Sequence, residues 1–220
     1  MTICELRSPD GKSVHEDPAA FEWHLVSLWA CRIFSAQTIG DNKTAFHYSQ
    51  MRCRNAEDEY SQTGKLRAFL PATYNDLGQS YAMNRLYGKA LSCFFKAEKF
   101  LKQMPGFQKD WLCSPYYRIA ITYHSLGEHD KAAQFVEGAI RDRESVVGQN
   151  DRVSSRTGLL YYILGNIRNS QGLFDEAYSL HHRAYLQCRQ TAGESSLAVL
   201  KCSQKLAEHY VRCGYDTDAR

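Results

Sequence analysis

The chain has 220 residues, of which 44% are hydrophobic and 23% are charged, and its formal net charge at pH 7 is +3. This charge is too small to indicate a nucleic-acid-binding protein. No apolar run approaches the length of a membrane span, and the N-terminus lacks the apolar core of a signal peptide. The composition therefore predicts one soluble domain in the cytoplasm.

The first part of the chain has the weakest pattern. Residues 1–17 show little apolar periodicity, and we expect them to form a loose leader. Residues 18–69 carry apolar side chains at helical spacing, followed by the turn-like run from Gly40 to Ala45. Ile33 precedes Gly78 by 45 residues, which is the spacing of the repeats described next. We therefore assign residues 18–69 to a degenerate first repeat.

Residues 70–220 repeat one arrangement of small and aromatic residues. The small residues that mark each repeat are 42, 45 and 42 residues apart, and they are Gly78, Ala120, Gly165 and Ala207. Twelve residues after each of them comes an alanine: Ala90, Ala132, Ala177 and Ala219. Nineteen residues after the first three comes another: Ala97, Ala139 and Ala184. A period of this length is typical of a helical solenoid.

The offsets predict a helix–turn–helix hairpin in every repeat. Small residues let two helices approach closely, and aromatic residues three or four positions away fill the contact. Gly127, Gly172 and Gly214 stand where the first helix should end in a left-handed conformation. Asp130 and Asp175 then stand where a second helix should begin, because acidic side chains suit a helix N-terminus.

The segments from Leu77-Gly78 to Ala97 and from Leu164-Gly165 to Ala184 resemble tetratricopeptide repeats. Their period exceeds the usual length of about 34 residues, and in this they resemble the repeats of kinesin light chains. The run from Lys205 to Gly214 also looks like fungal proteins with such repeats. The resemblance implies an all-α fold, a right-handed superhelical solenoid of antiparallel helix–turn–helix repeats.

The last repeat is truncated. Ala219 occupies the small position of a second helix, but only one residue follows it. The helix that carries Leu206, Tyr210 and Val211 would then expose apolar surface. We therefore expect that the natural polypeptide continues beyond Arg220 or that something covers this end, for example a second copy of the chain.

Motifs for catalysis or cofactor binding are missing from the sequence. It has no phosphate-binding loop, nucleophile elbow, dinucleotide fingerprint or zinc spacing. The eight cysteines are scattered without a C-x-x-C pair, and we expect reduced thiols. His181 and His182 are adjacent, so on a helix they would point about 100° apart rather than chelate one metal. The sequence thus predicts neither a cofactor nor a metal.

The groove lining offers the best candidates for a binding site. The resemblance implies that the first helix of each hairpin lines the concave face, and that amide side chains there bind the backbone of an extended peptide. Tyrosines would add flat contact area, and the basic C-terminal end would favour acidic partners. The candidate binding residues are Asn75, Gln79, Tyr117, Arg118, His124, Tyr162, Asn166, Asn169, Lys201, Lys205 and Arg212.

Two classes of function remain open at this point. The first is a non-catalytic scaffold or sensor module that binds a protein or an extended peptide, acidic in character, in the concave groove. The alternative is an enzyme or small-molecule-binding protein that uses Tyr117, His124 and Tyr162 as polar groups on an apolar wall. A carboxylate clamp of the kind found in some such repeats is not predicted, because Tyr117 and Ile163 stand where polar clamp residues are needed.

Overall fold

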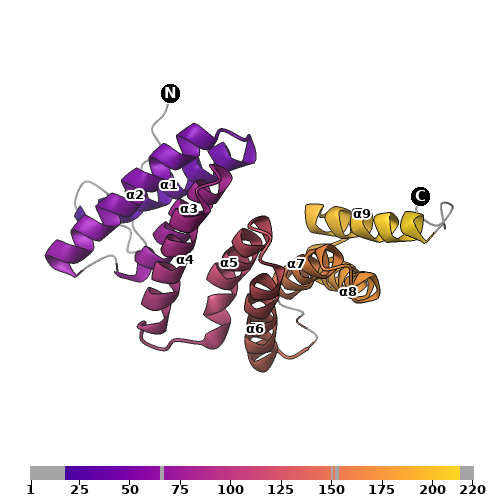
Figure 1. Ribbon diagram of the computed structural model, residues 1–220. Helices are drawn as coiled ribbons and strands as arrows, with labels where there is room; N and C mark the ends of the chain where they lie inside the picture. The colour runs from indigo at the N-terminus through magenta and orange to yellow at the C-terminus, as the bar shows by residue number, and fades with distance from the viewer. Residues whose placement is uncertain (1–17, 65–66, 150, 152–153, 214–220) are drawn as a thin grey trace. The chain divides into compact units, whose positions relative to one another are not determined.

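The computed structural model describes residues 18–64, 67–149, 151 and 154–213, and every regular element within these ranges is helical (Figure 1). The α-helices are α1 (Pro18–Thr38), α2 (Asn42–Thr63), α3 (Leu70–Met83), α4 (Tyr87–Lys102), α5 (Cys113–Ser125), α6 (His129–Val147), α7 (Arg156–Ser170), α8 (Phe174–Ala192) and α9 (Leu197–Arg212). Two short 3-10 segments, η1 (Arg67–Phe69) and η2 (Lys109–Leu112), lead into α3 and α5.

The two helices of each hairpin are joined by a turn of the same length and conformation. The turns from α1 to α2, α3 to α4, α5 to α6 and α7 to α8 each contain three residues. The middle residue has a left-handed backbone in all four: the φ angles are 76° at Gly40, 60° at Arg85, 79° at Gly127 and 78° at Gly172. The predicted left-handed ends at Gly127 and Gly172 are confirmed, whereas Gly214 lies outside the described residues.

Most of the predicted small residues lie in contacts between helices. Ala90, Ala132 and Ala177 on the second helices have no exposed surface, and neither do Ala97, Ala139 and Ala184 about two turns later. On α7, even a methyl group in place of the Gly165 hydrogen would come within 2.6 Å of the His181 ring on α8. The repeat pattern therefore marks true helix contacts.

The chain forms two compact units, residues 1–93 and 94–220, and the boundary falls within α4. In unit 1, α2 packs against α1 and α3. Ile33, the residue aligned with the small positions, is buried on α1, and Arg52 of α2 is ion-paired with Asp76 of α3. In unit 2, α6 packs against α5 and α7, and α8 packs against α7 and α9. The predicted leader lies outside the described residues.

A buried charge network closes the long connection between α6 and α7, a feature that the repeat pattern did not predict. The Arg143 guanidinium donates to Asp151 at 2.9 Å and to Asp110 at 2.8 Å. Asp151 also accepts from the Thr157 hydroxyl at 2.9 Å, and its side chain is fully buried. The connection is thus tied to η2, α6 and α7 at one point.

The lengths of the helices and the state of the cysteines can be read directly from the described residues. None of the helices in the described ranges is long and apolar enough to cross a membrane. The seven cysteines within those ranges are all free, and five of them are buried. The five buried thiols therefore act as small apolar core residues.

Candidate partner-binding site

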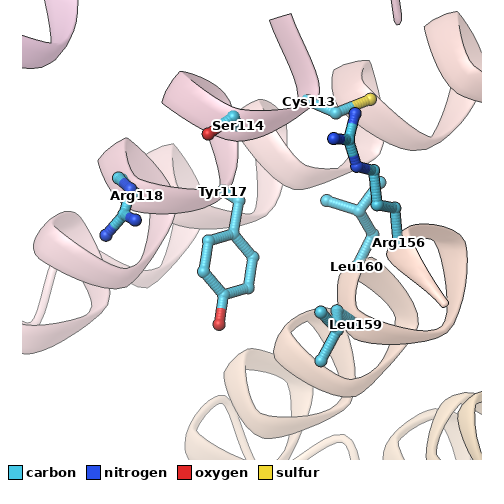
Figure 2. Close-up of a pocket in the computed structure, with 7 residues that line it drawn as sticks. All are labelled: Cys113, Ser114, Tyr117, Arg118, Arg156, Leu159 and Leu160. Atoms are coloured by element: carbon cyan, nitrogen blue, oxygen red, sulfur yellow. The ribbon is translucent and has the colours of Figure 1, made fainter. Parts of the chain in front are cut away.

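A pocket opens between α5 and α7, the first helices of the two hairpins in unit 2 (Figure 2). Its volume is about 210 Å³, and it is lined by Cys113, Ser114, Tyr117, Arg118, Arg156, Leu159 and Leu160. The two helices contact each other directly, so packing of the hairpins fixes the distance between the walls.

The walls of the pocket are mainly apolar. Leu160 is buried and Leu159 is half-buried on α7, and the ring of Tyr117 extends from α5 across the opening. Burial raises the pKa of Tyr117 above its ordinary value, so its hydroxyl stays neutral at physiological pH. A neutral phenol offers a flat apolar face with a single polar tip.

Two arginines give the pocket its charge. In Figure 2 the guanidinium groups of Arg118 and Arg156 lie on opposite sides of the Tyr117 ring. None of the described residues that line the pocket is acidic. Burial raises the pKa of Cys113 to about 11, so the thiol is protonated at neutral pH and is a poor nucleophile. The pocket therefore combines apolar walls with two basic side chains.

The structure brings two of the predicted binding residues, Tyr117 and Arg118, into this pocket. Three others, Asn166, Asn169 and Arg212, are engaged by their own chain. The side-chain oxygen Oδ1 of Asn166 lies 3.2 Å from His181 Nε2, and Oδ1 of Asn169 accepts a hydrogen bond from Arg212 at 2.9 Å.

The remaining predicted residues are dispersed. Lys205 is ion-paired with Glu208 at 2.6 Å, and Lys201 is exposed. In unit 1, the side chain of Asn75 is buried and that of Gln79 is half-buried.

The polar residues of the alternative, catalytic hypothesis do not meet in the pocket. The Nδ1 atoms of His124 and His129 lie 3.1 Å apart at the turn between α5 and α6. The ring centroids of Tyr162 and His181 lie 5.7 Å apart. Burial and the neighbouring His129 lower the pKa of His124. Within the described ranges, no group of three or more metal-ligating side chains converges.

The sequence reasoning missed two features of this region. Arg156 begins α7, further upstream than the positions that the repeat offsets assign to the groove. The side chain of His181 is 1% exposed, and its Nδ1 lies 2.9 Å from Nε2 of His209. This contact links α8 to α9. A signal for the second feature was available, because the residues at the same offset in the preceding repeats are the buried Phe94 and Val136.

Comparison with known proteins places this architecture among the tetratricopeptide-like solenoids. BtubC (BKLC) from P. vanneervenii is similar over 94% of this chain and 79% of its own, with a TM-score of 0.71 and 20% identity. A structure of kinesin light chain TPR-like repeats from Podosopora anserina is similar over 89% of this chain and 91% of its own, with a TM-score of 0.63 and 14% identity.

MamA from Desulfovibrio magneticus RS-1 is a third structure of this kind, with a TM-score of 0.52 and 15% identity over 89% of each chain. No protein-family model and no curated protein matches the sequence. The predicted all-helical, tetratricopeptide-like fold is therefore confirmed by the structure itself and by its neighbours.

Proposed function

We propose that this protein is a non-catalytic interaction scaffold, and that the α5–α7 face of unit 2 binds an extended segment of a partner protein. The pocket lined by Tyr117, Leu159 and Leu160 is the observation on which the proposal depends. It would receive one large apolar or aromatic side chain of the partner.

The size of the pocket favours a side chain over a complete small-molecule ligand. Sites for drug-sized ligands and cofactors usually enclose about 300–1,000 Å³, whereas this pocket has about 210 Å³. The separation of Tyr117, His124 and Tyr162 also weighs against the catalytic alternative, because neither His124 nor Tyr162 lines the pocket with Tyr117.

The charge of the pocket favours an acidic partner. Arginine binds carboxylates through planar, paired donors, and such contacts strengthen when water is excluded. Arg118 and Arg156 flank the opening, so an acidic residue next to the buried apolar one would find a guanidinium on either side.

The contact surface in the proposal continues along the first helices towards α9. The carbonyl oxygens of Asn166 and Asn169 are held by His181 and Arg212, which leaves their amide NH₂ groups as donors for the carbonyls of a peptide. The free cysteines support a reducing, cytoplasmic setting for this interaction. The further residues of the surface are His124, Tyr162, Lys201, Lys205 and Arg212.

A peptide library tests the proposal. The probes are labelled peptides with a central Trp, Phe or Leu flanked by either acidic or basic residues, and binding is measured by fluorescence anisotropy. We expect binders only in the acidic set. Arg156→Ala or Leu159→Glu should weaken them at least about tenfold, because each removes a wall or a charge of the pocket.

Arg189→Ala is the matched control, since Arg189 is an equally exposed arginine on α8 outside the pocket. It should leave peptide affinity unchanged. Binding that survives both pocket variants, or that is as strong for the basic peptides, would contradict the proposed site.

A further inference from the structure

Helix α9 exposes an apolar side chain at a position that the other hairpins of unit 2 bury. Leu200 lies seven residues before the small residue Ala207, and it is 65% exposed. The residues at the same offset in α5 and α7 are Cys113 and Gly158, and both are buried.

The second helix of the same hairpin covers those two positions. The Cys113 thiol donates to the Ala139 carbonyl of α6 at 3.6 Å. A Cβ atom on Gly158 would meet the sulfur of Cys188 on α8 at 2.6 Å. At the position of Leu200, the exposed side of α9 is thus the side that an antiparallel helix covers in α5 and α7. Among the described helices, α9 is the last, and it packs beside α8 (Figure 1).

The exposed and half-buried residues on this side of α9 follow the spacing of a coiled-coil seam. They recur at intervals of three and four residues along the helix: Leu197, Leu200, Gln204, Ala207 and Val211. Leu197 is 65% exposed and Val211 is 55% exposed, although both are large apolar side chains. Alternating spacings of three and four place side chains on the one stripe that a second helix can cover.

We propose that α9 pairs with α9 of a second copy of this chain, in antiparallel orientation about a two-fold axis. In the register that stacks the seam residues in layers, Leu200 meets Val211 of the second copy, and Gln204 meets its Ala207. A two-fold pairing repeats each contact, so one short stripe supplies four layers. This inference does not rest on the pocket between α5 and α7, although Lys201 also belongs to the contact surface proposed above.

The charges beside the seam select this orientation. Lys201 and Glu208 both flank the stripe on the same side. In the antiparallel register, Lys201 of each copy faces Glu208 of the other, which gives two ion pairs across the interface. In a parallel pair they would lie beside the uncharged Ser196 and Ser203. Gln204, as the single polar residue in the seam, also limits the registers that pack well.

The interface is short, so we expect a dimer that depends on concentration. Sedimentation velocity and light scattering on the full chain, from about 5 to 500 µM, should show a reversible shift from monomer to dimer. Leu200→Glu should abolish the dimer over this range without loss of helical circular dichroism, because Leu200 is already exposed in the monomer. Val146→Glu, at an exposed apolar position on α6, is the control and should leave the dimer intact.

A charge reversal tests the orientation separately. Lys201→Glu should weaken the dimer at least about tenfold, and the double variant Lys201→Glu/Glu208→Lys should restore it. A wild-type chain that stays monomeric at about 500 µM would overturn the proposal and leave this face to a different partner. A dimer that persists in Leu200→Glu would overturn the interface, and failure of the double variant to restore it would overturn the antiparallel register.

Discussion

Single atoms decide how close the helices of a hairpin can come. Gly165 of α7 faces the ring of His181, a residue with 1% exposure, and no room remains for a side chain between them. Gly138, in the middle of α6, has a different environment, because a Cβ atom there would meet only the end of the Arg141 side chain at 3.9 Å. Of these two helical glycines in the same unit, only Gly165 lies where a methyl group would not fit.

Gly165→Ala should therefore destabilise the protein, although alanine is the better helix former. Overpacking a close contact costs about 1–3 kcal/mol, which outweighs the gain of about 1 kcal/mol in helix propensity. Gly138→Ala is the matched control and should be neutral or stabilising. The free energy of unfolding from urea denaturation measures both, and equal stability of the two variants would contradict the tight contact between α7 and α8.

At the scale of elements, the network around Arg143 fixes the connection between α6 and α7. Its acidic partners, Asp151 and Asp110, come from the connection itself and from η2. Both carboxylates and the guanidinium are buried, so bulk water does not surround the ion pairs. Removing one partner of a buried ion pair strongly destabilises the folded state, because the other charge stays buried without compensation.

Asp151→Ala should cost about 3–5 kcal/mol, because it leaves a buried guanidinium with only part of its compensation. The comparison is Glu194→Ala, which breaks the exposed ion pair with Arg189 and should cost less than about 1 kcal/mol. Thermal or urea unfolding of both variants provides the measurement. A loss for Asp151→Ala no larger than that for Glu194→Ala would show that the network does not stabilise the connection.

For the whole molecule, the repeat architecture could be predicted from the sequence because its determinants are local and recurrent. Small residues such as Ala132 and Ala177, and the left-handed turns at Gly127 and Gly172, lie at fixed offsets, and each repeat checks the others. The hairpins and their closest contacts follow from that pattern alone.

The site could be predicted only in part. Tyr117 and Arg118 follow from the groove offsets, whereas Arg156 depends on where α7 begins after a connection of irregular length. The pairing of Asn166 with His181 joins two helices of one hairpin, and it depends on a rotation of side chains that spacing does not specify.

Acid should weaken the fold as a whole through the two buried histidines. Burial lowers the pKa of His181 to about 4 and also lowers the pKa of His209, where Arg212 adds to the effect. Lys205 lowers both, while Glu208 acts in the opposite direction. An unfolded histidine has a pKa of about 6.5, so the unfolded chain binds more protons below that pH.

Stability contributed by the neutral imidazoles is therefore fully present above a pH of about 6.5 and is lost as the pH falls towards about 4. We expect this part of the loss to be on the order of 1–3 kcal/mol. Urea unfolding at a series of pH values, together with NMR titration of the imidazole signals, can measure it. A His181 signal that titrates at the ordinary value would contradict the buried, neutral pair.

The left-handed turn residue also bears on how far such chains can diverge. Four hairpins turn through the same backbone state, and at Arg85 they do so without glycine. At that position the fold therefore requires a left-handed conformation rather than a particular residue. It also requires a few small side chains in each repeat of forty-odd residues. So sparse a requirement leaves most of the sequence free to vary, and structures with 14–20% identity to this chain share its fold.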